Sequence, residues 1–122
     1  MPTKNPAVRQ TNRRANTKRP PVLFTRTQRI IGQIEEQIGH RILTYWNSNN
    51  GSVCQNDVIA IYGLLRRLGP QEEVTLFIKS DGGSGQASLM MVNLLRQFTR
   101  RLVAVVPLEC QSAATMLALG AD

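Results

Sequence analysis

The chain has 122 residues, of which 42% are hydrophobic and 5% are aromatic, so it has room for one domain with a core of Leu, Ile, Val and Ala. No apolar run reaches the ~18 residues of a membrane span, and the first residues lack the apolar stretch of a secretory signal. Because Cys54 and Cys110 have neither metal nor redox spacing, we expect a cytoplasmic protein with reduced thiols and no bound metal.

The net charge of +7 is concentrated at the N-terminus. Of the 15 basic and eight acidic residues, six basic and no acidic ones lie within residues 1–22. This stretch has almost no large apolar residue and ends at Pro20-Pro21. It is therefore predicted to be a disordered arm before a folded domain over residues 23–122. Contact of the arm with nucleic acid or a membrane surface is the less favoured alternative.

The first half of the folded domain reads as helix, strand and helix. Isoleucines recur at helical spacing up to Gly39, which predicts a helix over residues 26–38. "RILTYW", residues 41–46, is typical of a strand, and the turn-rich "NSNNGS" follows it. The next apolar face predicts a helix that opens near Asn56 and Asp57 and closes at Gly69-Pro70.

The second half repeats the strand–helix pattern. "EVTLFIK", residues 73–79, predicts a strand with apolar residues on both faces, and an apolar stripe from Ala87 to Phe98 predicts a helix. "RLVAVV", residues 101–106, predicts another buried strand, and "SAATMLALGAD" begins a last helix. Apolar strands alternating with amphipathic helices predict an α/β fold with a parallel sheet covered on both faces.

Two loops are expected to meet at the carboxyl edge of this sheet. Loops 80–84 and 107–111 both follow strands, and right-handed crossovers place the ends of parallel strands on one edge. Ser112 starts a helix beside the second loop. An acyl-transfer site needs such a hydroxyl together with backbone N–H donors. The N–H groups of Gly82 or Gly83 and of Ala113 are the candidate donors.

These residues also have plainer interpretations. Taken alone, a serine at a helix start more often caps the helix, and "DGG" occurs in many turns. A nucleotide site fits poorly, because "GGSG" matches neither glycine-rich phosphate fingerprint. "CQSAA" does not match the nucleophile turn of α/β-hydrolases either.

Three segments resemble one protein family. "RIIGQIEEQIGHRILTYW", "LFIKSDGGSGQAS" and "VAVVPLECQSAATMLALGAD" resemble the opening helix and strand, the Pro-Gly-Gly turn and the nucleophile segment of the serine dehydrogenase proteinase family. That family belongs to the Clp protease and crotonase superfamily and is related to signal peptide peptidase A. The resemblance covers about Arg29 to Asp122. Its last two segments at this spacing form a fairly specific pair.

The resemblance implies a serine endopeptidase that works inside a homo-oligomer on peptide or protein substrates, without metal or cofactor. Residue by residue, Ser112 falls on the nucleophile, and Gly82, Gly83 and the N–H of Ala113 fall on the oxyanion hole. Asp81 stands where the family has proline. Ala113 and Ala114 stand where it has two glycines, which we expect to narrow access to the site.

The general base is the largest departure from the family pattern. In such folds it lies well downstream of the serine, and ten residues follow Ser112 here. His40 is expected on the opposite sheet edge. Lys79, which ends its strand on the correct edge, is the better local candidate, although a solvated strand-end lysine is the plainer interpretation. We therefore expect a truncated piece of a longer protein, inactive if it is the complete product.

Two other functions remain open from the residues alone. The absence of a clear base and the presence of Asp81 motivate a second hypothesis, a non-catalytic module that builds oligomers or binds peptides. A crotonase-like acyl-CoA site, where the paired N–H donors hold a thioester oxygen, ranks lowest because it does not require Ser112.

Overall fold

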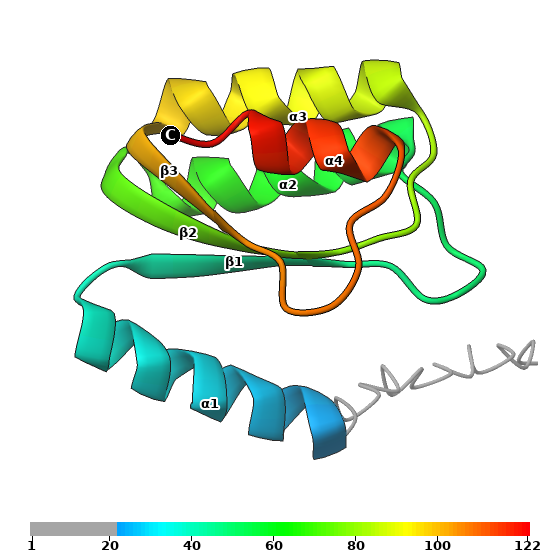
Figure 1. Ribbon diagram of the computed structural model, residues 1–122. Coiled ribbons are helices and arrows are strands. Elements are labelled where there is room, and N and C mark those ends of the chain that lie inside the picture. The colour runs from blue at the N-terminus through cyan, green and yellow to red at the C-terminus, as the bar shows by residue number, and fades with distance from the viewer. Residues whose placement is uncertain (1–21) are drawn as a thin grey trace, which may run out of the picture.

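A computed structural model of the protein describes residues 22–122, so the predicted basic arm lies outside the described residues except for Val22. The described chain alternates helices and strands in the predicted order (Figure 1). The elements are α1 (Val22–Ile38), β1 (Arg41–Trp46), α2 (Gln55–Leu68), β2 (Gln71–Lys79), α3 (Gly85–Phe98), β3 (Thr99–Val105) and α4 (Ala113–Leu119).

Helix α1 and strands β2 and β3 begin earlier than the sequence patterns predicted. Helix α1 starts at residue 22 rather than 26. Leu23 and Phe24 in its first turns are exposed, so they do not continue the apolar pattern by which the helix was predicted. Strands β2 and β3 each start two residues early, because Gln71 pairs with Thr99 through the backbone. A polar strand end of this kind carries no apolar signal.

The three strands form a parallel sheet in the order β1-β2-β3. The register places Thr44 of β1 opposite Phe77 of β2, and Leu76 of β2 opposite Ala104 of β3. Helices α2, α3 and α4 cover one face of the sheet, and α1 lies on the other (Figure 1). The predicted parallel sheet with helices on both faces is confirmed.

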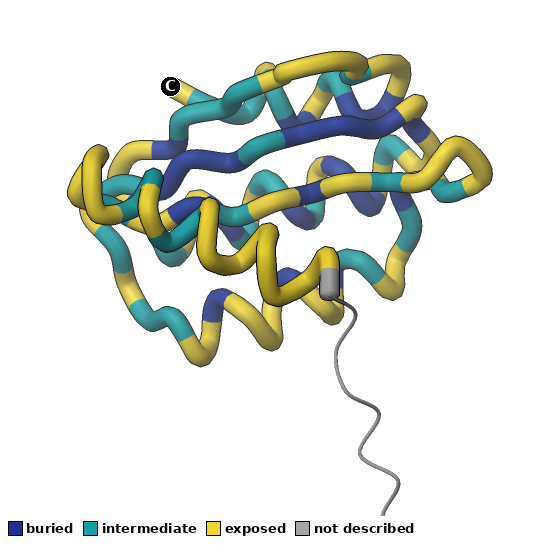
Figure 2. Tube along the Cα trace, turned by 90° about the horizontal axis from the view of Figure 1, so that it is seen from below, coloured by how far each residue is buried: buried dark blue, intermediate teal, exposed yellow. Residues whose placement is uncertain are grey.

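The hydrophobic core lies between the sheet and the layer formed by α2, α3 and α4. Its fully buried large side chains come from all three of these helices and from β2 and β3, and they are Leu65, Leu76, Ile78, Met91, Leu95, Leu102 and Leu117. Figure 2 shows this burial along the strands and the inner faces of the helices, whereas α1 is mostly exposed. Each buried leucine contributes about 1.5–3 kcal/mol, so the packing in this layer stabilises the fold.

Helix α2 begins at a turn that the sequence located to within two residues. Cys54 is its N-cap, and the backbone N–H of Cys54 donates to Asp57 Oδ2 at 2.9 Å. The same Asp57 oxygen accepts a hydrogen bond from the Tyr45 hydroxyl at 2.7 Å. Asp57 therefore connects the start of α2 to β1. None of the helices within residues 22–122 is long and apolar enough to cross a membrane.

Candidate active site

The two loops predicted to meet are joined by backbone hydrogen bonds. Ser80, directly after β2, forms a parallel bridge with Cys110. The Ser80 N–H donates to Glu109 O at 3.0 Å, and the Gln111 N–H donates to Ser80 O at 3.0 Å. This bridge continues the β2–β3 pairing beyond the strands. It places Ser112 beside the turn formed by Gly82 and Gly83, called the glycine turn below.

Ser112 has a backbone conformation that residues other than glycine rarely adopt. Its φ is 51° and its ψ is −129°, and it is the one non-glycine residue with positive φ between residues 22 and 122. Holding such a conformation costs about 1–3 kcal/mol. The side chain is exposed and makes no hydrogen bond that caps α4. Capping therefore does not explain this serine.

The glycine turn admits Ser112 because it lacks side chains. A Cβ on Gly82 would lie 2.6 Å from the Ser112 Cβ and 3.1 Å from its Oγ. A Cβ on Gly83 would lie 2.5 Å from the backbone N and O of Val53. Both glycines also have positive φ, at 112° and 142°. The two positions therefore require glycine for space and for conformation.

The N–H groups of the predicted oxyanion hole have different surroundings. The Gly82 N–H donates to Ser80 Oγ at 3.2 Å. Within the described part of the chain, the N–H groups of Gly83 and Ala113 have no acceptor. A free N–H therefore lies in the turn next to Ser112 and another lies in the residue that follows it.

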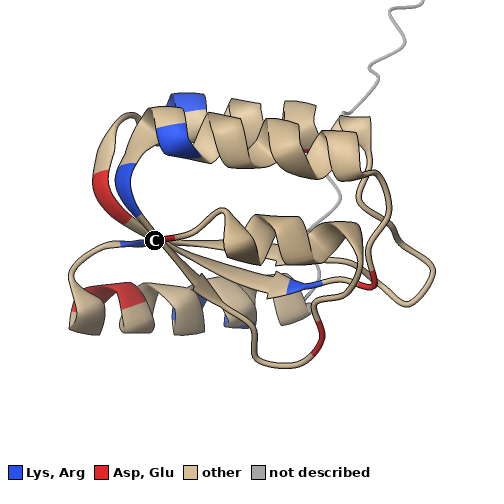
Figure 3. Cartoon of the chain, turned by 45° about the horizontal axis from the view of Figure 1, so that its top comes forward, with Lys and Arg blue, Asp and Glu red and all other residues tan. Residues whose placement is uncertain are grey.

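The two alanines after Ser112 are buried. Ala113 is 6% exposed and Ala114 is fully buried in the core cluster, so their methyl groups point away from the surface. Helix α4 carries no charged residue, as Figure 3 shows. The expectation that these two alanines narrow access to the site stays a prediction.

Lys79 is held in place rather than solvated. It is 9% exposed, and its Nζ donates to Asn47 O and to Asn49 Oδ1, each at 3.3 Å. Because side chains alternate along a strand and Ile78 lies in the core, Lys79 points to the sheet face covered by α1. No hydrogen bond joins it to Ser112 in the described structure. Its role as a base stays a prediction.

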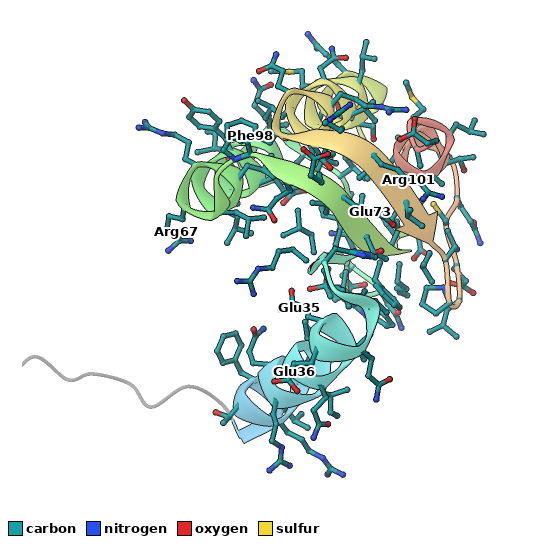
Figure 4. All side chains as sticks on the ribbon, turned by 90° about the vertical axis from the view of Figure 1, so that its left-hand side faces the viewer. Glu35, Glu36, Arg67, Glu73, Phe98 and Arg101 are labelled. Carbon is teal, nitrogen blue, oxygen red and sulfur yellow. The ribbon has the colours of Figure 1, made fainter. Side chains whose placement is uncertain are left out.

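His40 lies at the other edge of the sheet, as predicted. Its Nε2 is 2.8 Å from Thr75 Oγ1 and 3.7 Å from Glu73 Oε1. Glu73 also pairs with Arg101 on the neighbouring strand at 3.5 Å (Figure 4). This polar cluster adjoins the start of β1, whereas Ser112 follows the carboxyl end of β3. Among residues 22–122, no group of His, Cys, Asp or Glu is placed to hold a metal ion.

Comparison with known proteins determines the family. A sequence model of the Clp protease family matches residues 25–122. The chain belongs to the Clp protease family. No curated protein sequence matches it.

The fold agrees with solved members of the Clp protease family. ClpP1 from Listeria monocytogenes and a point mutant of it each have a TM-score of 0.57 and 18% sequence identity to this chain. Each alignment covers 74% of this chain and 52% of the ClpP1 chain. The chain therefore spans about half the length of these ClpP1 chains.

Three residues around Ser112 were missed from the sequence. Val53 holds the glycine turn, since its N–H donates to Gly82 O at 2.8 Å and its carbonyl accepts from Ser84 N–H at 2.9 Å. Ser80 and Asn47 lie beneath the turn and bond to each other. Their positions in loops after strands were visible, but the orientation of their side chains was not.

Proposed function

We propose that the protein is a serine endopeptidase of the Clp type, with Ser112 as the nucleophile. The observation that supports this most is the exposed Ser112 in a strained backbone conformation, packed against a glycine whose Cβ would collide with it. Strain of this kind is retained at functional sites. A serine with only a structural role requires neither feature.

In the proposed reaction, Ser112 Oγ attacks the carbonyl carbon of a peptide bond and its proton passes to a base. The carbonyl oxygen becomes negatively charged, and the free N–H groups of Gly83 and Ala113 donate to it. The C–N bond then breaks, the amine leaves with the proton, and water hydrolyses the acyl-enzyme. One such donor typically contributes about 10²–10³ in rate.

The three residues predicted for the oxyanion hole thus receive separate roles. Gly83 and Ala113 supply the donors. Gly82 gives Ser112 the space to approach, because its own N–H is already bound to Ser80 Oγ. Within the described residues Lys79 remains the candidate base, and reaching Ser112 would require its Nζ to leave Asn47 and Asn49.

The narrower assignments belong to the same proposal. Three segments resemble the serine dehydrogenase proteinases, relatives of signal peptide peptidase A, and we place the protein closest to that branch. We also propose a cytoplasmic homo-oligomer that acts on peptide or protein substrates. The large apolar side chains exposed on α2 and α3, which include Ile59 and Leu89, support association with further copies.

Labelling with a fluorophosphonate tests the nucleophile directly, because the probe reacts with activated serines. The purified protein is treated with the probe and the modified peptide is mapped. We expect the label on Ser112, no label in Ser112→Ala, and normal labelling in Ser48→Ala, which alters an exposed loop serine. Labelling at another residue, or none in a folded protein, contradicts the proposal.

A second candidate is a non-catalytic Clp-type module that binds peptides or builds oligomers. It is favoured by one observation: in the described residues, no base is hydrogen-bonded to Ser112 Oγ. Peptide binding that is equal in the wild type and in Ser112→Ala, with no turnover in either, supports this function over hydrolysis.

A further inference from the structure

We infer that Ser80 and Asn47 are positioning residues that fix the glycine turn for anion binding, a role that rests on the proposed hydrolysis at Ser112. Ser80 is fully buried. Its hydroxyl donates to Asn47 Oδ1 and accepts the Gly82 N–H at 3.2 Å. Both hydrogen-bonding functions of this hydroxyl are therefore used, one toward the loop after β1 and one toward the turn.

The hydrogen bonds at Gly82 determine the direction of the unpaired N–H of Gly83. The Gly82 C=O and the Gly83 N–H belong to one planar trans peptide unit and point in opposite directions. The Gly82 carbonyl is held by the Val53 N–H at 2.8 Å, so the Gly83 N–H points away from Val53. Ser80 holds the Gly82 N–H on the preceding peptide unit. With both units tied, Gly83 presents its N–H without reorganisation, as oxyanion stabilisation requires.

Asn47 is itself fixed by backbone and side-chain contacts. Its N–H donates to Lys79 O at 2.9 Å, and its carbonyl accepts from Lys79 Nζ at 3.3 Å. The backbone of Asn47 is therefore held against Lys79, and its side-chain oxygen accepts the Ser80 hydroxyl. A continuous chain of hydrogen bonds runs from Lys79 through Asn47 and Ser80 to Gly82.

A merely structural role would also keep these polar groups paired, so the test compares two shape-matched variants. Ser80→Thr keeps the hydroxyl, and Ser80→Val replaces it with a methyl group of the same shape. Both add the same bulk at a buried site, so their difference reports the hydroxyl. Asn47→Ala removes the acceptor from a half-buried position, and Ser48→Ala is the control in the same loop.

Two measurements are made on each variant. The first is the rate of fluorophosphonate labelling of Ser112 per folded molecule, and the second is hydrogen exchange at the Gly82 amide. We expect Ser80→Val to label about tenfold more slowly than Ser80→Thr, which is less than the loss of a donor itself. Asn47→Ala is expected to label more slowly than Ser48→Ala. The Gly82 amide exchanges faster in Ser80→Val than in Ser80→Thr.

Equal labelling of Ser80→Val and Ser80→Thr overturns the inference, even if one of them is less stable. If both fail to fold, equal labelling of Asn47→Ala and Ser48→Ala overturns it. If the wild type is not labelled, the proposed hydrolysis fails independently of this inference. Hydrogen exchange at the Gly82 amide then tests whether Ser80 and Asn47 position the turn. Unchanged exchange then rejects the positioning of the turn, and faster exchange in Ser80→Val or Asn47→Ala supports it.

Discussion

Gly82 is the residue on which the approach of Ser112 to the turn depends. With φ of 112° and a Cβ position 2.6 Å from the Ser112 Cβ, alanine is excluded there by conformation and by space. We predict that Gly82→Ala lowers the free energy of unfolding by about 1–3 kcal/mol and abolishes labelling of Ser112. Urea denaturation and fluorophosphonate labelling check the two effects.

Gly63→Ala is the matched control for this variant. Gly63 is exposed in the interior of α2, and a Cβ there would meet nothing within 4 Å. Alanine is the better helix former, so this change should stabilise the protein by up to about 1 kcal/mol. If both variants had the same stability and the same labelling, the packing of Gly82 against Ser112 would not constrain the site.

Tyr45 gives a pH-dependent prediction at the residue scale. Burial, and then the hydrogen bond to Asp57, raise the pKa of Tyr45 above its usual range. Because the folded-state pKa is raised, the contribution to stability is complete below about pH 10, the usual tyrosine pKa, and is lost as the pH rises further. In Tyr62→Phe, Tyr45 is the single tyrosine.

The phenolate absorbance of Tyr62→Phe is followed during alkaline titration. We expect little signal at about pH 10, where a tyrosine in an unfolded chain is half ionised, and a rise that coincides with unfolding. The same variant in urea provides the reference titration. An ordinary titration curve in the folded variant would show that Tyr45 is accessible to solvent and does not hold Asp57.

At the scale of the elements, hydrogen bonds of Asp122 hold the C-terminal end of α4 in place. The Asp122 N–H donates to Leu102 O and the Leu102 N–H donates to Asp122 Oδ2, both at 2.8 Å. Arg96 of α3 donates to Asp122 Oδ1 at 2.7 Å. These bonds connect the segment after α4 with β3 and α3. They keep the far end of the helix that follows Ser112 against the sheet.

The hydrogen bonds of the Asp122 carboxylate should weaken in acid. The hydrogen bond from Arg96, and then that from the Leu102 N–H, lower the pKa of Asp122. A lowered folded-state pKa contributes stability above the unfolded value of about 3.9, and this is lost as the pH falls through the lower folded value. Asp122→Asn should therefore be less stable than wild type at pH 7, and its stability should fall less in acid.

Urea midpoints measured at pH 7 and below pH 4 test this prediction. Glu36→Gln serves as the control, because Glu36 is an exposed carboxylate on α1. It should leave both midpoints close to those of the wild type. A parallel fall of wild type and Asp122→Asn in acid would assign the acid sensitivity to other carboxylates.

The elements also show what sequence reasoning captured. The apolar strands predicted a parallel sheet. With strands 73–79 and 101–106 as neighbours, such a sheet implied that loops 80–84 and 107–111 lie side by side, which the Ser80–Cys110 bridge confirms. The direction of a single hydroxyl was beyond such patterns. The roles of Ser80 and Asn47 depend on rotamers and loop conformation, which hydrophobic periodicity does not encode.

At the scale of the whole molecule, one copy leaves large apolar side chains exposed. Ile59 is 66% exposed and Leu89 is 52% exposed, and they belong to the helices that border a groove of about 420 Å³ between α2 and α3. Apolar surface of this kind is usually covered by a partner. We therefore predict that the 13.6 kDa chain self-associates through the outer face of α2 and α3.

Sedimentation velocity over a range of concentrations tests the predicted association. Ile59→Lys places a charge on the apolar face, whereas Asn56→Lys adds the same charge at an exposed polar position of α2. We expect Ile59→Lys to weaken association at least tenfold, about 1.4 kcal/mol, because burying an unpaired lysine is costly. Asn56→Lys should associate like the wild type. A wild type that stays monomeric at every concentration contradicts the prediction, and equal weakening by both lysines would attribute the effect to net charge rather than to this face.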